Sequence, residues 1–221
     1  MSQSNPNKYK LPIVHLSFGE EVGNSVSHGV MCVALLCLLP YVAIHSYLKG
    51  GTLLAVSESI FIISMFLMFL ASTLYHSMAY DTKHKYIFRK LDHIFIYVAI
   101  AGSYTPIALY IVGGLLGWVI FAIQWICVLF GILYKSLSSN RKTKASIIIY
   151  LIMGWLAVLF IPQIIRESGI AFIALILGGG VFYSVGAWFY KQKTRPYFHF
   201  IWHLFINMAC ICHFIAIVYL I

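Results

Sequence analysis

Residues 53–76 read LLAVSESIFIISMFLMFLASTLYH, and this stretch decides the class of fold. A helix needs about 20 mainly apolar residues to cross the hydrocarbon core of a bilayer, and this run is long enough. Glu58 is its one charged residue. The strict alternation of apolar and polar residues that is typical of an outer-membrane strand is absent from it. The stretch therefore predicts a transmembrane α-helix.

The whole chain has the same apolar character. Of its 221 residues, 62% are hydrophobic and only 10% are charged, whereas a soluble domain carries about a quarter charged residues. Seven apolar segments are predicted to span the membrane: 26–48, 53–76, 91–112, 115–134, 145–165, 170–190 and 199–221. We therefore expect an all-α bundle of seven transmembrane helices, formed by residues 26–221 after a polar cytoplasmic segment, 1–25.

The basic residues predict the orientation of the chain. With the N-terminus in the cytoplasm, all of the 15 lysines and arginines except Lys49 and Arg166 fall on the cytoplasmic side. Short loops with this bias follow the positive-inside rule, so we expect an N-in, C-out topology. The same residues account for the net charge of +9, and their scatter over short loops argues against a nucleic-acid partner.

Prolines and glycines mark special positions inside the predicted helices. Pro40 and Pro106 are expected to kink or locally open their helices, because proline lacks a backbone donor. The glycines at 178–180 and Gly186 are expected to permit close helix packing.

The seventh segment opens with His199-Phe-Ile-Trp-His203. Residues at i and i+4 share a helix face and lie about 6 Å apart along the axis. Two imidazoles in that arrangement can chelate a metal ion, although the pattern alone is a weak signal.

Topology brings further polar residues to the same depth. His76 ends the second segment, whereas Asp92 opens the third, so both belong to cytoplasmic helix ends together with His199 and His203. Three neutral imidazoles suit Zn²⁺ and leave a fourth tetrahedral position for water. The sequence therefore predicts a zinc site formed by these three histidines.

Asp92 and Ser72 are the predicted catalytic residues beside that site. Zinc lowers the pKa of a bound water to about 7, and Asp92 could hold this water and act as a general base. Ser72, one turn before His76, could steady an oxygen of the substrate or the water. The alternatives are a salt bridge from Asp92 to Arg89 or Lys90, and a hydrogen bond from Ser72 to its own helix.

The remaining histidines give weaker signals. His28 shares a helix face with Asn24 and is interpreted either as a packed residue or as support for the metal ligands. His213 lies about 21 Å beyond His199 along the helix, too far to bind the same ion. His93 points away from Asp92 and is expected to pack.

Three of the six acidic residues lie near helix ends. Glu20 and Glu21 precede the first predicted helix, where they are expected to cap it or to face the basic loops. Glu58 is expected near the outer interface, where its carboxylate would snorkel to water.

The ordered set of motifs resembles the hemolysin III family of bacterial membrane proteins, within the progestin and adipoQ receptor superfamily. The resemblance covers about 90% of the chain and rests on EEVGNSVSHG at 20–29, STLYH at 72–76, KLDH at 90–93, GSYTP at 102–106, HFIWH at 199–203 and CHF at 212–214.

This resemblance implies a seven-helix, N-in protein of the bacterial inner membrane. It also implies an intramembrane zinc held by His76, His199 and His203, with Ser72 and Asp92 alongside, and a relation to membrane hydrolases that cleave lipid amides.

Our leading hypothesis is a zinc-dependent hydrolase acting on a lipid amide or ester and contributing to membrane homeostasis. The alternatives are a cytolytic pore, a non-catalytic regulator of membrane energetics or fluidity with a structural zinc, and, as a minor one, a transporter. Membrane lipid is the expected partner in the leading hypothesis.

Overall fold

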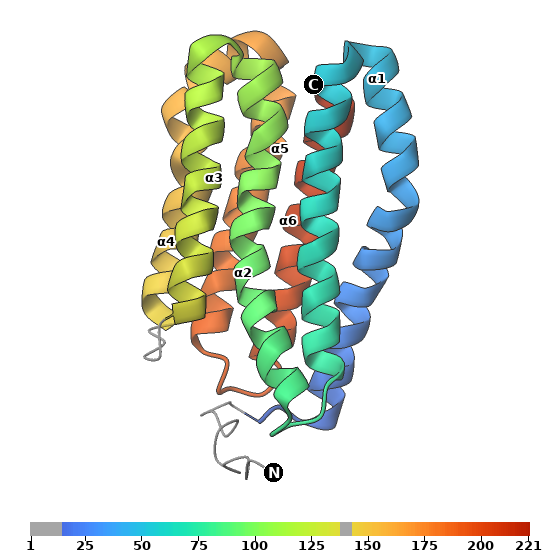
Figure 1. The fold of residues 1–221 in the computed structure, drawn as a ribbon, viewed down its shortest axis with the longest axis vertical. Coiled ribbons are helices and arrows are strands. Elements are labelled where there is room, and N and C mark those ends of the chain that lie inside the picture. Colours follow the sequence, from blue (N-terminus) through green and yellow to red (C-terminus); the bar gives the residue numbers. More distant parts are fainter. Residues whose placement is uncertain (1–14, 138–142) are drawn as a thin grey trace, which may run out of the picture.

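The computed structural model describes residues 15–137 and 143–221. Every regular element in these two ranges is a helix, which confirms the all-α prediction. Figure 1 shows the helices packed lengthwise into one bundle, with the C-terminus at the end opposite to the start of α1. In chain order the elements are α1 (Phe18–Ser77), α2 (Lys83–Pro106), the π-helix η1 (Ile107–Val112), α3 (Gly114–Leu137), α4 (Thr143–Trp155), the 3₁₀ helix η2 (Leu156–Phe160), α5 (Ile161–Lys191) and α6 (Phe198–Leu220).

The number of continuous helical spans differs from the prediction. Five spans in the described residues are long and apolar enough to cross a membrane, not seven. Two of them contain a sharp turn, because the backbone leaves helical values at Gly50 and Gly51 within α1 and at Gly169 within α5. Gly51 and Gly169 have φ of 71° and 80°, which glycine adopts without a Cβ penalty. Figure 1 shows α1 rising along its blue part and returning along its cyan part.

α1 begins earlier than predicted, at Phe18, because a capping box stops it from fraying. The Glu20 backbone N–H donates to Ser17 Oγ at 3.3 Å, and Glu20 Oε2 accepts from the Ser17 backbone N–H at 3.0 Å. Glu20 Oε1 also accepts from the Tyr197 backbone N–H at 2.6 Å. The expected capping role of Glu20 is thus confirmed, and the same carboxylate ties the start of α1 to the residue before α6.

The two prolines behave differently. Pro106 is followed directly by η1, so the helix opens into a π-helical turn as predicted. Around Pro40 the backbone keeps helical φ and ψ values, and only Gly50 and Gly51 depart from them in α1. One missing backbone donor is therefore tolerated in the middle of α1.

Close packing is confirmed for two of the glycines singled out in the sequence. A Cβ at Gly179 would lie 2.4 Å from the ring of His213, and one at Gly186 would lie 3.1 Å from the side chain of Trp202. A Cβ at Gly178 would meet nothing within 4 Å. Gly179 and Gly186 thus let α5 approach α6, whereas Gly178 has no such role.

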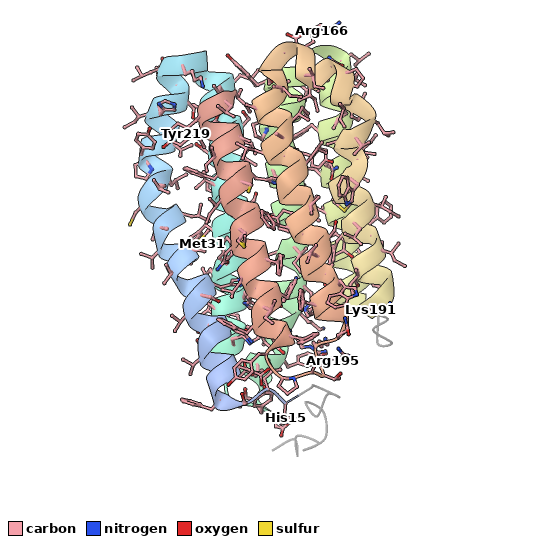
Figure 2. The ribbon with its side chains drawn as sticks, turned by 180° about the vertical axis from the view of Figure 1, so that it is seen from behind. His15, Met31, Arg166, Lys191, Arg195 and Tyr219 are labelled. Carbon is pink, nitrogen blue, oxygen red and sulfur yellow. The ribbon has the colours of Figure 1, made fainter. Side chains whose placement is uncertain are left out.

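The outer surface of the bundle suits lipid. Large apolar side chains such as Leu115, Ile170 and Leu159 are 70% to 82% exposed. Charged residues gather at the ends: Figure 2 places Lys191 and Arg195 at one end and Arg166 at the other. Such a surface is expensive in water and favourable in a bilayer. The chain is therefore a multi-pass membrane protein.

Replacing Gly179 by alanine is expected to destabilise the α5–α6 contact. The added methyl would overlap the His213 ring, and overpacking of this kind costs about 1–3 kcal/mol. We expect a lower Tm in detergent for Gly179→Ala than for the neighbouring control Gly178→Ala, which adds its methyl in open space and gains helix propensity. Equal Tm values for the two variants would show that the α5–α6 contact is not close-packed at Gly179.

Candidate metal centre

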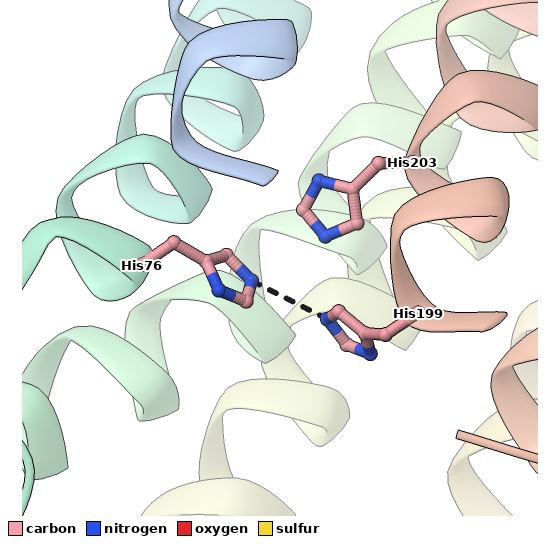
Figure 3. A group of neighbouring side chains, drawn as sticks. All are labelled: His76, His199 and His203. Atoms are coloured by element: carbon pink, nitrogen blue, oxygen red, sulfur yellow. Dashed lines mark hydrogen bonds between the residues drawn. The ribbon is translucent and has the colours of Figure 1, made fainter. Parts of the chain in front are cut away.

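Three histidines meet inside one end of the bundle (Figure 3). His76 comes from the last turn of α1, and His199 and His203 come from the first turns of α6. All three are buried, and one ligand nitrogen of each lies within 4.8 Å of the other two. The prediction that the helix ends bring these histidines together is confirmed. The arrangement could hold a metal ion.

The nearest pair of nitrogens fits a shared metal ion. His76 Nε2 and His199 Nε2 are 3.3 Å apart. Two nitrogens that bind one tetrahedral Zn²⁺ at about 2.0–2.1 Å are separated by about 3.3–3.4 Å. Their spacing therefore already matches one edge of a coordination tetrahedron.

Unpaired nitrogens also point to a missing ligand. Among the described residues, neither ring nitrogen of His203 and only one of the two nitrogens of His199 makes a well-formed hydrogen bond. A buried polar atom without a partner costs about 1–3 kcal/mol, so native proteins rarely leave several together. A metal ion that accepts imidazole lone pairs would satisfy these atoms, and the donor set therefore fits zinc.

Glu21 contacts the ring nitrogen of His76 that does not face His199. Its Oε2 lies 2.5 Å from His76 Nδ1, and its Oε1 accepts from Lys85 Nζ at 2.6 Å and from the Tyr80 hydroxyl. A carboxylate can only accept, so the His76 proton sits on Nδ1 and the Nε2 lone pair points toward His199. This arrangement of carboxylate, histidine and metal position is common in metalloproteins.

The sequence missed most of this support. Glu21 was expected at a cap or near basic loops, and it does meet Lys85, but its contact with His76 was not predicted. Its position along the chain could have indicated the contact. Glu21 lies in the first turn of α1, and the predicted topology puts that turn at the same cytoplasmic side as His76. Tyr80, between α1 and α2, is also part of the network. Burial and then its hydrogen bond to Glu21 raise the pKa of Tyr80, so the phenol stays neutral and donates.

Asp92 lies beside the three histidines without joining them. It is 5% exposed, and its carboxylate interacts electrostatically with His76 and lies near Ser72. Its oxygens are not part of the three-histidine group found among the described residues. Within the described residues Asp92 makes one ion contact, to His93 at 3.6 Å, so the alternative salt bridge to Arg89 or Lys90 is not formed.

Ser72 also lies next to the site, beside Asp92. Its side chain is 1% exposed and its Oγ makes no well-formed hydrogen bond within the described ranges, so it does not bond back to its own helix. The hydroxyl lies beside the Asp92 carboxylate, to which it can donate. The catalytic roles of Ser72 and Asp92 stay predictions.

The other histidines divide into two kinds. The His28 ring stacks on His203 with centroids 3.8 Å apart, so it forms a wall of the site. His93 and His213 pack elsewhere: His93 bonds to the Arg89 carbonyl at 2.7 Å, and His213 bonds to the Ile176 carbonyl at 3.2 Å.

A cavity of about 150 Å³, partly open to the outside of the bundle, adjoins the site. Asp92 and His28 line it on the side of the histidines, and it extends between α2, α4, α5 and α6 as far as Ile107. Since Asp92 and Ile107 lie on one helical path, the cavity runs roughly 20 Å along the bundle. Most of its wall is apolar, with side chains such as Met68, Ile96, Leu151, Ile176, Trp202 and Ile206.

Comparison with known proteins gives consistent results. The family described as Haemolysin-III related matches residues 16–214. Hemolysin-3 of Bacillus cereus is 38% identical over 187 residues, which is 85% of each chain. The Hemolysin-3 homolog of Bacillus subtilis (strain 168) is 37% identical over 187 residues, 85% of this chain and 87% of that one. The human monocyte to macrophage differentiation factor is 30% identical over 159 residues, 68% of this chain and 64% of that one.

Replacing Glu21 by glutamine is expected to weaken metal binding about 10- to 100-fold, because the amide neither holds His76 as firmly nor raises its basicity. Titration of the purified metal-free protein with Zn²⁺ measures the affinity. Glu167→Gln is the control, since Glu167 is exposed and pairs with Arg166 at the opposite end of the bundle (Figure 2). An equal loss in both variants would mean that Glu21 does not support the metal site.

Proposed function

Because this chain belongs to the hemolysin III family of membrane proteins, we propose that it is a zinc-dependent hydrolase that cleaves an amide or ester bond of a membrane lipid. One observation carries the proposal. The histidines His76, His199 and His203 lie together beside Asp92, and an apolar cavity starts at that carboxylate.

The three histidines are the proposed zinc ligands. Zinc held there would supply a Lewis acid that polarises a carbonyl and promotes loss of a proton from water. Since Asp92 stands outside the three-histidine group of the described residues, the set supports an open site with a position for water or substrate. A structural zinc site would use four protein ligands.

Asp92 and Ser72 are the proposed acid–base and hydrogen-bonding residues. Asp92 accepts a proton from the attacking water while the water oxygen bonds to the carbonyl carbon. The same carboxyl then returns that proton to the nitrogen or oxygen that leaves as the carbon–nitrogen or carbon–oxygen bond breaks. The Ser72 hydroxyl, which lies beside Asp92, donates a hydrogen bond to the carbonyl oxygen as negative charge develops on it.

The cavity is the proposed site for the acyl chain. An acyl chain that enters the cavity from the bilayer exchanges lipid tails for apolar side chains, so its length and shape, and not its hydrophobicity, decide how well it fits. Because the cavity is narrow, elongated and apolar, it would align such a chain with its carbonyl end near Asp92. The fold would thus select lipids by their chains, and the reaction would alter the lipid composition of the membrane.

Activity is expected to depend on the metal ligands and on Asp92. The purified protein should release fatty acid from a panel of amide- and ester-linked lipids. We expect His199→Ala and Asp92→Asn to reduce the rate by a factor of about 100 or more. His45→Ala is the control, since His45 packs against the rings of Tyr41 and Tyr219 and is not part of the three-histidine group of the described residues. Fatty-acid release that both site variants retain would contradict the mechanism.

A cytolytic pore is the second candidate, supported by the names of the two Bacillus relatives. A pore needs a polar lumen, whereas the cavity of this bundle is mainly apolar. Dye release from liposomes by both wild type and His76→Ala, without fatty-acid release by either, would favour the pore. Zinc bound by four protein ligands, without either activity, would favour a non-catalytic regulator.

The proposal includes a seven-crossing, N-in arrangement in the inner membrane of a bacterium. The turns at Gly50–Gly51 and Gly169 support it, because each would divide one apolar span into two antiparallel crossings. Alkaline phosphatase fused after Gly51, Gly113 or Gly169 should be active outside the cell membrane. The same fusion after Tyr80 or Gln192 should be inactive. The opposite pattern would reverse the topology and place the histidines at the outer face.

A further inference from the structure

Glu58 is buried at the end of the bundle opposite to the histidines. It lies on the same arm of α1 as His76, about 27 Å away along the helix. Its side chain does not snorkel to water as the sequence suggested, because the residue is 1% exposed. Leu54, Phe61 and Ile62 on the same arm are also fully buried.

Ser46 is the one hydrogen-bond partner of Glu58 within the described residues. Ser46 Oγ lies 2.5 Å from Glu58 Oε2 and 2.6 Å from the carbonyl oxygen of Val42. Ser46 is itself fully buried, and Glu58 Oε1 has no partner in this part of the chain. The contact joins the two arms of α1 across the turn at Gly50–Gly51.

Counting hydrogens decides the protonation state of this pair. A serine hydroxyl has one hydrogen to donate, and the Val42 carbonyl can only accept. If Ser46 donates to Val42, the hydrogen between Ser46 and Glu58 has to come from Glu58. If Glu58 were ionised, one of the two short oxygen–oxygen contacts would contain no hydrogen, and two acceptors would face each other.

Charge leads to the same result. Lys49 is the charged residue that acts on Glu58, but its Nζ donates to the Tyr219 carbonyl at 3.2 Å and is not within ion-pair distance of the carboxyl group. An isolated carboxylate in apolar surroundings is expensive, whereas a neutral acid with one good hydrogen bond is tolerated.

We propose that Glu58 is a proton-binding site that holds a proton at neutral pH and donates it to Ser46. Ser46 in turn donates to Val42, so a chain of two hydrogen bonds fastens the second arm of α1 to the first. The site is separate from the histidine cluster and takes a proton, not a metal ion, as its ligand.

Infrared spectroscopy of the purified full-length protein at neutral pH tests this directly. A protonated carboxyl group has a carbonyl stretch well separated from the carboxylate bands. The difference between wild type and Glu58→Gln should show the loss of one protonated-acid band. The same band should persist in Asp92→Asn and in Lys49→Ala. Loss of a carboxylate band in Glu58→Gln, with no loss of an acid band, would overturn the proposal.

Ser46→Ala provides a second test that keeps Glu58 in place. This variant removes the acceptor of the Glu58 O–H group. The carbonyl stretch of the Glu58 acid should then shift to higher frequency, because a carboxylic acid without a hydrogen bond absorbs at higher frequency than a hydrogen-bonded one. An unchanged acid band would show that Glu58 does not donate to Ser46. This variant also decides the matter if Glu58→Gln does not fold.

Discussion

The hydrocarbon core of a bilayer can neither donate nor accept a hydrogen bond, so each buried polar side chain of this bundle has to find its partner within the protein. At the end that holds the histidines, Glu21 is the partner of three side chains at once. It joins the start of α1 to the His76 turn at the end of α1, to Tyr80 and to the first turn of α2 at Lys85. Glu20 adds α6 through the Tyr197 backbone. Two neighbouring carboxylates therefore fix the helix ends that carry the site.

The fold could be predicted as far as hydrophobic length allows. Apolar runs of about 20 residues identify helical segments, and Pro106 marks the helix opening at η1. The breaks predicted between residues 48 and 53 and between residues 165 and 170 contain Gly50, Gly51 and Gly169, and the backbone leaves helical φ and ψ values at these glycines. The sharpness of each turn, which takes only one or two residues, could not be predicted. A pattern of apolar residues shows where a chain can cross a membrane, but it does not show how tightly a glycine can turn it.

The site could be predicted for residues whose positions follow from helix ends. The predicted topology gives His76, His199 and His203 the same depth in the membrane, and the structure confirms that they lie close together. Glu21 and Glu58 could not be assigned this way, because depth does not say which way a side chain points around its helix. The arrangement of neighbouring helices decides that Glu21 faces His76 and that Glu58 faces Ser46 and not lipid. Rotational position is a property of packing, and no periodicity in this chain reveals it.

The two buried polar clusters differ in whether protons alone can satisfy them. At Glu58 one proton supplies the hydrogen that the Ser46 and Val42 contacts require. At the histidines protons leave more atoms unsatisfied, because a neutral imidazole has one donor and one acceptor, and neither ring nitrogen of His203 makes a well-formed hydrogen bond among the described residues. Protonating every ring would place several positive charges side by side in an apolar bundle. A single divalent cation takes up several lone pairs at once, with Asp92 nearby to balance its charge. The unmet lone pairs therefore favour a metal ion over a packed histidine cluster.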